Sequence, residues 1–192
     1  LRPKLLSCRL IPQLDAALAR GLGCNLDRHQ SVAIVTCDQD DSLYAALDHC
    51  TKFAKVDIVY ARSFYAGSAH ASGPLSGECM GVIAGRDPDD VAEAIWALRQ
   101  ALERDICFYQ GEGEKQPAFF PHVISSLGHY LSAQAGLAVG QPMAYLIAPP
   151  TESVVALDRA LKSARVDLVK YFGPPTETNF GGAYLSGTLP EI

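Results

Sequence analysis

The sequence predicts an α+β fold in which one unit of ferredoxin-like character occurs twice in tandem. Residues 46–59 (ALDHCTKFAKVDIV) and 156–169 (ALDRALKSARVDLV) are identical at eight of fourteen positions, at an offset of 110 residues. Self-similarity at a fixed offset is the signature of a duplicated structural unit. Short β-branched runs, such as SVAIVTC at 31–37, alternate with segments whose apolar residues recur at helical spacing. Each copy therefore has the order strand, helix, strand, helix, strand, loop, strand.

Turn and capping residues define the first copy as much as its apolar pattern does. Gly21 and Gly23 end the first helix, and Asp40 or Asp41 can cap the second. An Asp87-Pro88 pair is a strong start for a final amphipathic helix. The predicted elements are a strand at 5–11, a helix at 14–22, a strand at 31–37, a helix from 40 to about 54, a strand at 56–61, a loop at 63–77, a strand at 78–84 and a helix from 88.

The polar segment 110–117 (QGEGEKQP) marks the boundary between a first domain at 1–109 and a second at 110–192. The predicted elements of the second domain are a strand at 118–124, a helix ending near 135, a strand at 143–148, a helix at 151–164, a strand at 166–172, a loop at 173–182 and a strand at 183–186. The last helix of the unit, which begins at Pro88 in the first copy, is absent from the second. We therefore expect apolar surface there, which either a segment missing from this chain or a neighbouring subunit covers.

An acidic insertion distinguishes the two copies. Upstream of the matched segment the copies align at an offset of 113 rather than 110, so the first copy has three additional residues within 36–45. That stretch contains Asp38, Asp40 and Asp41, where the second copy has the sequence PPTE. Since a helix cap needs one acid, the adjacent pair Asp40 and Asp41 is a candidate for another role.

Composition limits the possible partners. The net charge is −5 and Lys and Arg are not clustered, which argues against nucleic acid as a partner. No run approaches the roughly 18 apolar residues of a membrane span, and no signal peptide is visible, so we expect a cytoplasmic protein without membrane contact. Six cysteines, none with CxxC spacing, are expected to be reduced.

The motifs of catalysis and cofactor binding are missing from the sequence. It has no GxSxG elbow, no HExxH and no phosphate-binding loop. His70 has no second His or Cys at ligand spacing, so we expect no metal site. The expectation is a protein with no catalytic residue and no cofactor.

Three segments carry a resemblance to a known family. The sequences YARSFYAGSAH at 60–70, PMAYLIAPP at 142–150 and PPTETNF at 174–180 resemble EutL-like shell proteins of ethanolamine-utilisation bacterial microcompartments. That family consists of two tandem, circularly permuted microcompartment-shell domains, and three chains form a pseudo-hexameric trimer, a tile of the shell. The resemblance implies a homotrimer that contacts other shell proteins, located in the microcompartment shell.

The resemblance also implies passage of metabolites rather than bond chemistry. In the family a central pore is gated by flexible loops, and a small acidic pore crosses each subunit; in some members a small amine such as ethanolamine binds there. The implied gating loop comprises Phe64, Tyr65, Ala66, Gly67, Ser68, Ala69, His70, Gly73 and Gly77. The positions that match the acidic pore are Asp40, Asp41, Glu78, Phe108 and Thr178.

Two other functions remain open at this point. Clustered carboxylates can have separated pKa values, so Asp40, Asp41 and Glu78 could serve acid–base catalysis, although no nucleophile or cofactor loop accompanies them. Tandem ferredoxin-like domains could instead form a sensor of small molecules. Asp40 or Asp41 as a simple cap, and Glu78 as solvated surface, are the alternatives without function.

Overall fold

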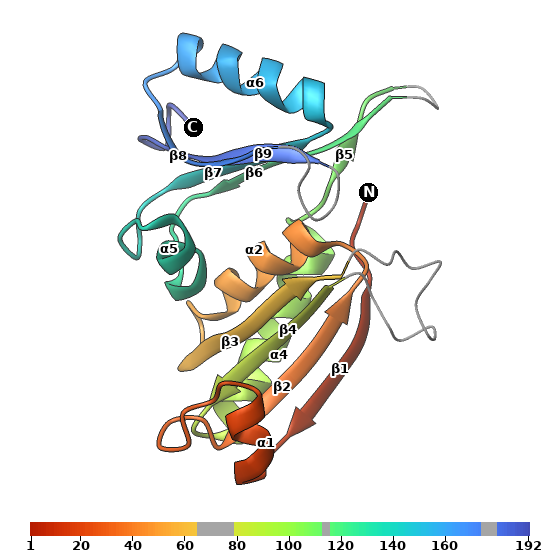
Figure 1. Ribbon diagram of the computed structural model, residues 1–192, viewed down its shortest axis with the longest axis vertical. Helices are drawn as coiled ribbons and strands as arrows, with labels where there is room; N and C mark the ends of the chain where they lie inside the picture. The colour runs from red at the N-terminus through yellow and green to blue at the C-terminus, as the bar shows by residue number, and fades with distance from the viewer. Residues whose placement is uncertain (65–78, 113–115, 174–179) are drawn as a thin grey trace. The chain divides into compact units, whose positions relative to one another are not determined.

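The computed structural model describes residues 1–64, 79–112, 116–173 and 180–192, and these form two compact units (Figure 1). The N-terminal unit contains Arg2–Ile106 together with Gly128–Tyr130. The C-terminal unit contains Leu1, Cys107–Leu127 and Leu131–Ile192.

The N-terminal unit is a four-stranded antiparallel sheet with helices packed on it (Figure 1). The strand order is β1-β2-β4-β3, so the two central strands are β2 and β4. Its elements are β1 (Leu5–Ile11), α1 (Ala16–Gly21), β2 (Ser31–Cys37), α2 (Asp40–Cys50), β3 (Val56–Ser63), β4 (Cys79–Gly85) and α4 (Pro88–Arg104).

The two faces of this sheet carry different helices. Alternate residues of a strand point to opposite faces. Leu14 and Ala19 of the α1 region pack against Val32 on one face. The opposite face carries Val35, which lies near Leu47 of α2, and α4 packs beside α2 against β1, β2 and β4. Helices α2 and α4 thus cover one face of the sheet, and the α1 region packs on the other.

The start of α4 confirms the sequence prediction, and the bounds of α2 correct it. Asp87 caps α4 by accepting a hydrogen bond from the N–H of Asp89 at 3.0 Å, with Pro88 in the first turn. The prediction that Asp40 or Asp41 caps α2 is wrong, because both lie inside its first turn and Gln39 is the capping position. The helix also ends at Cys50 rather than near residue 54, since the chain continues there in turns.

The C-terminal unit repeats this plan in a five-stranded antiparallel sheet of order β5-β6-β7-β9-β8 (Figure 1). Its elements are β5 (Tyr109–Gln110), β6 (Ala118–Ile124), α5 (His129–Ala135), β7 (Met143–Ala148), α6 (Pro150–Ser163), β8 (Asp167–Phe172) and β9 (Gly181–Ser186). The helix α6 packs Leu157 against Ala183 and Leu185 of β9. Among residues 116–173 and 180–192, no helix corresponds to α4.

Irregularities of the backbone are duplicated along with the regular elements. The register of β3 shifts between Ile58 and Tyr60, and that of β8 shifts between Leu168 and Lys170, again at an offset of 110. Gly23 and Gly136, at an offset of 113, both have positive φ, of 75° and 68°. Only glycine adopts that conformation readily, so the two turns share one backbone requirement.

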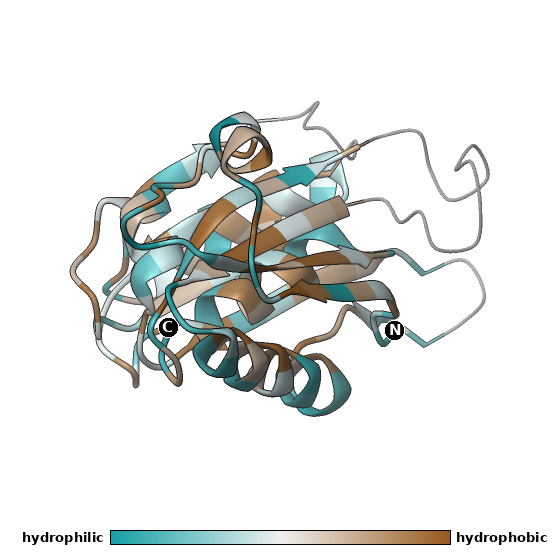
Figure 2. Cartoon of the chain, turned by 90° about the horizontal axis from the view of Figure 1, so that it is seen from below, coloured by the Kyte–Doolittle hydropathy of each residue, from teal (hydrophilic) through white to brown (hydrophobic). Residues whose placement is uncertain are grey.

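Hydrophobic residues are concentrated on the strands, and the helices combine hydrophobic with hydrophilic residues (Figure 2). This is the pattern of an α+β fold whose helices bury one face each, and it confirms the predicted class. Among the helices that the structure describes, none has the length and apolar composition needed to cross a membrane.

Candidate functional site

Strands β2 and β3 of the N-terminal sheet end, and β4 begins, at the same edge of the sheet, close to the first turn of α2. Cys37 at the end of β2 pairs with Cys79 at the start of β4, and Cys79 pairs in turn with Ser63 at the end of β3. Asp40 and Asp41 lie at this end of the sheet, with 9% and 6% of their surface exposed. Antiparallel pairing therefore brings two buried carboxylates to the end of the sheet where β3 ends and β4 begins.

The environment of Asp40 shifts its protonation. Burial raises the pKa of Asp40 above its ordinary value, because desolvation disfavours the charged form. Hydrogen bonds from the N–H of Asp41, at 2.9 Å, and from the Ser63 side chain act in the opposite direction. A cation beside this carboxylate would favour its ionised form, so the arrangement can couple binding of a cation to loss of a proton.

The thiols of Cys37 and Cys79 lie at the same end of the sheet as Asp40. The Cys79 thiol donates to the carbonyl oxygen of Cys37 at 3.3 Å, and both side chains are fully buried. A hydrogen bond with the Cys37 thiol, together with burial, raises the pKa of the Cys79 thiol well above its ordinary value. All six cysteines are free, as the sequence predicts, and the raised pKa of Cys79 keeps its thiol in the neutral form.

Of the other predicted site residues, Phe64 and Phe108 lie in the described part of the chain. Phe108 belongs to the C-terminal unit, where it is buried against Phe120 and Phe180 with ring centroids 5.1 and 6.2 Å apart. Phe64 is exposed at the end of β3. The remaining predicted positions lie outside the described residues, and these are Glu78, Thr178 and the gating-loop residues Tyr65, Ala66, Gly67, Ser68, Ala69, His70, Gly73 and Gly77.

Sequence reasoning missed a buried carboxylate within the repeated segment. Asp48 has 1% of its side chain exposed and accepts a hydrogen bond from the N–H of Gly128 at 2.7 Å. Its ammonium partner is Lys52, at 3.8 Å. The N–H of His129 donates to Thr51 on the same helix turn at 3.0 Å. The identity of Asp48 and Asp158 in the two copies was the available signal, but it does not distinguish burial from exposure.

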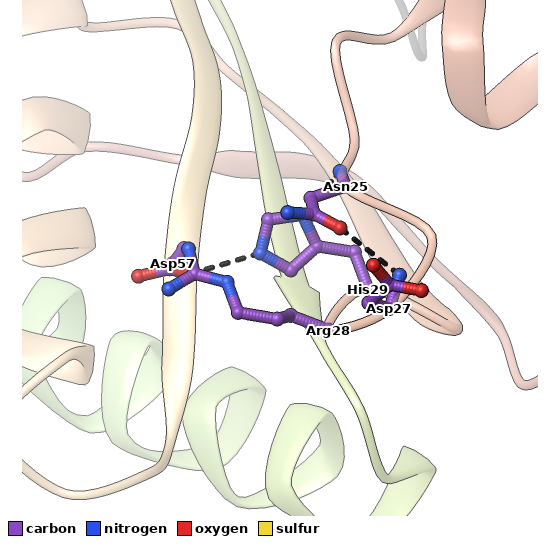
Figure 3. Close-up of polar contacts among 5 residues, drawn as sticks. All are labelled: Asn25, Asp27, Arg28, His29 and Asp57. Carbon is purple, nitrogen blue, oxygen red and sulfur yellow. Dashed lines mark hydrogen bonds and ion pairs between the residues drawn. The ribbon is translucent and has the colours of Figure 1, made fainter.

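A second missed contact joins the loop after α1 to β3 (Figure 3). The Nδ1 atom of His29 accepts from the N–H of Asn25 at 3.0 Å, so the proton of the neutral ring is on Nε2. That atom lies 2.9 Å from Asp57 Oδ2, which also binds Arg28 at 2.8 Å. His29 is 4% exposed, and the contact fixes its tautomer and holds the loop on β3.

An open cleft of about 1090 Å³ lies at the opposite end of this sheet from Asp40 and Asp41. Its walls carry charges of both signs, including Arg28, Lys55, Asp87 and Glu93. In the part of the chain that the structure describes, no three His, Cys, Asp or Glu side chains are grouped so that they could hold a metal ion.

The comparisons with known proteins agree with one another. A family model described as the BMC domain matches residues 31–110. The bacterial microcompartment shell protein EutL of Clostridium perfringens is 41% identical over 188 residues, which cover 98% of this chain and 86% of that protein. The crystal structure of ethanolamine utilization protein EutL from Leptotrichia buccalis is 44% identical, has a TM-score of 0.94 and covers 100% of this chain and 88% of its own.

A more distant structure shares the fold alone. PduB, a trimeric bacterial microcompartment shell protein, is 18% identical with a TM-score of 0.78, covering 96% of this chain and 81% of its own. The relatives are structural proteins, so the alternative of acid–base catalysis by the buried carboxylates falls away. The chain belongs to the EutL family of bacterial microcompartment shell proteins, and its role is structural rather than enzymatic.

Proposed function

We propose that three copies of this chain form a pseudo-hexameric tile of the shell, with the two repeats, 1–109 and 110–192, as its alternating units. The duplicated strand order and the matching register shifts of β3 and β8 support this proposal, because near-equivalent units can alternate around one axis. PduB, which shares the fold, is itself a trimer. The tile contacts other shell proteins along its edges.

The second part of the proposal is that Asp40 and Asp41, with Glu78, Phe108 and Thr178, bind a small ammonium ligand in a narrow acidic pore. The observation that carries it is the buried pair of carboxylates where β2 and β3 end and β4 begins. Burial lowers the effective dielectric constant, so each ionised carboxylate attracts an ammonium group more strongly there than in water. Ethanolamine, which the names of the relatives associate with this family, is the first ligand to test.

The third part concerns control of passage. The segment Phe64–Gly77 joins β3 to β4 at the same end of the sheet as Asp40. Ser63, which precedes this segment, hydrogen-bonds to Asp40 and pairs with Cys79 of β4, so a ligand that contacts the carboxylates there lies near both flanks of the segment. We propose that this loop gates a central pore of the trimer and that amine binding biases the gate, because a ligand shifts a two-state equilibrium when it contacts one state better.

Calorimetric titration of the purified protein with ethanolamine tests the ligand assignment. We expect binding to weaken about five- to tenfold in Asp41→Asn and Glu78→Gln, which each remove one charge near the ammonium group. Asp158→Asn, which neutralises an exposed carboxylate of the second copy, should bind as the wild type does. Ethylene glycol, which has the same length without the charge, should not compete.

Unchanged affinity in both Asp41→Asn and Glu78→Gln would remove the acidic-pore assignment. Binding of ethanolamine by a chain that stays monomeric at micromolar concentration would instead favour a free sensor over a shell tile.

A further inference from the structure

In the N-terminal unit, the segment Gly128–Tyr130 packs on α2. The N–H of Gly128 donates to the Asp48 carboxylate at 2.7 Å, and the N–H of His129 donates to the Thr51 hydroxyl at 3.0 Å. The segment belongs to the second repeat by sequence and α2 belongs to the first, so these hydrogen bonds join the two repeats. We name this contact the internal junction.

The internal junction requires a glycine at its centre. Gly128 has no side chain that could cap α5, and Asp48 and Thr51 accept the N–H groups instead. A Cβ atom on Gly128 would collide with the Thr51 hydroxyl and with the Asp48 carbonyl oxygen. Beside these hydrogen bonds, the ring centroids of Tyr44 and Tyr130 lie 6.5 Å apart. The internal junction is therefore close-packed and hydrogen-bonded.

The first repeat has a matching segment at 15–17. Leu14 and Leu127, which precede the two segments, align at an offset of 113 and are both buried. The N–H of each donates to a glutamine carbonyl oxygen, at 2.8 and 2.9 Å. The residue in the place of Gly128 is Asp15, which caps α1 itself by accepting a hydrogen bond from an N–H group of the first turn at 2.8 Å.

Helix α6 of the second repeat exposes the face that α2 uses in the internal junction. At an offset of 110, the first-repeat residues of the junction match Val154, Asp158 and Leu161. Val154 and Leu161 are 48% and 40% exposed. Asp158 is paired with Lys162 at 2.7 Å. The face of α6 thus presents two apolar side chains on either side of a carboxylate that already has a partner.

The start of α1 exposes an apolar side chain as well. Leu18 is 48% exposed, whereas Leu131, which matches it in the second repeat, is 1% exposed. In a closed ring of three chains, a contact between the repeats of one chain recurs between the second repeat of that chain and the first repeat of the next. This recurrence rests on the tile proposed above, and it brings α6 of one copy against the start of α1 of the next.

We propose that the face of α6 with Val154 and Leu161 packs on Leu18 of a second copy, and that this junction between chains is apolar where the internal junction is hydrogen-bonded. Asp15 already accepts the first N–H groups of α1, so α1 needs no acceptor from the other chain. Asp15 also has a side chain where the internal junction has a glycine, and its charge repels Asp158. Burial of the exposed apolar side chains therefore stabilises the contact.

Sedimentation velocity of the full chain tests this junction. Leu161→Glu places an unpaired charge in the contact, so we expect the midpoint concentration of trimer assembly to rise at least about 100-fold. Val139→Glu is the control, because Val139 is 53% exposed in the turn between α5 and β7 and should leave the trimer intact. Adding Leu18→Lys to Leu161→Glu should restore the trimer, since opposite charges then meet across the contact.

The outcomes separate this inference from the tile itself. A wild-type trimer together with an unchanged assembly midpoint for Leu161→Glu would overturn the junction and leave the tile standing. A Leu161→Glu monomer that Leu18→Lys does not restore would also overturn the junction, because the two residues would then lie apart. A wild-type monomer would contradict the tile, and the junction with it.

Discussion

Asp48 and Asp158 occupy the same position in the repeated sequence, yet one carboxylate is buried and the other faces solvent. The exposed fractions of their side chains are 1% and 57%. Asp48 accepts a hydrogen bond from the N–H of Gly128, whereas Asp158 accepts one from Lys162, one helix turn away, at 2.7 Å. The two helices form for the same local reasons, so the difference comes from what packs against each of them.

The neighbours of α2 and α6 explain this contrast. Helix α2 packs beside α4 and against the Gly128–Tyr130 segment, so that most of its residues are buried. Helix α6 has Ser153 and Leu157 as its buried residues, and Val154 and Val155 are exposed. In the part of the chain that the structure describes, α2 packs beside a second helix, whereas α6 packs on β7 and β9.

The largest expected effect is at Asp48. We expect Asp48→Ala to lower the free energy of unfolding by about 3 kcal/mol, because it leaves the buried N–H of Gly128 without its acceptor and removes the partner of Lys52. Asp158→Ala should cost about 0.3 kcal/mol, as for an exposed helical ion pair. Urea unfolding measures both. Equal costs would show that the two copies differ less than their burial indicates.

The second largest effect on stability is expected at the His29–Asp57 contact, which has no counterpart among the described residues of the second copy. We expect His29→Leu to cost about 1.5 kcal/mol, since both the Asn25 N–H and Asp57 lose a buried hydrogen-bond partner. Arg28→Gln is the control, because it removes an exposed ion pair with the same Asp57 carboxylate. It should lower the free energy of unfolding by at most about 0.5 kcal/mol. A cost for His29→Leu no larger than that of Arg28→Gln would mean that the loop is held by packing alone.

The smallest effect on stability is at Asp40, and it should have the opposite sign. Because its folded-state pKa is raised, Asp40 contributes stability that is present below its unfolded pKa and lost as the pH rises through the folded pKa. At pH 7 the ionised side chain therefore opposes folding, and Asp40→Asn should raise the Tm. The gain should shrink as the pH falls toward 4. A variant less stable than wild type at pH 7 would contradict the assignment of desolvation as the main cause.

The same carboxylate should make amine binding depend on pH. An ammonium ligand favours ionised Asp40, so the proposed ethanolamine affinity should fall as the pH is lowered from 7 toward 4. Titration calorimetry at several pH values measures this, and Asp40→Asn should flatten the dependence. A steep dependence that persists in Asp40→Asn would place the titrating group elsewhere.

Local patterns were sufficient for most of the fold. The strands β1, β2, β6 and β7 begin and end where their β-branched or apolar runs do, and Asp87-Pro88 marks the start of α4. The end of α2 was misplaced because Thr51, Lys52 and Phe53 continue the chain in helix-like turns, and the Thr51 hydroxyl binds the Asp48 carbonyl at 2.7 Å. That contact depends on side-chain geometry rather than on periodicity.

The site was predictable only in part. The acidic insertion pointed to Asp40 and Asp41, and the structure shows both of them buried where β2 and β3 end and β4 begins. His29 and Asp57 are 28 residues apart in sequence, and no short motif links them. Asp48 is buried beside Gly128, 80 residues away in sequence. Its repeat partner Asp158 is exposed, so the repeat alone does not predict the burial of Asp48.

Molar mass in solution, from light scattering coupled to size exclusion, tests the central claim that two near-equivalent repeats form one third of a closed tile. The account predicts a species of three chains of 20.6 kDa each, about 62 kDa, at micromolar concentration. A monodisperse monomer of 20.6 kDa at the same concentration would contradict it.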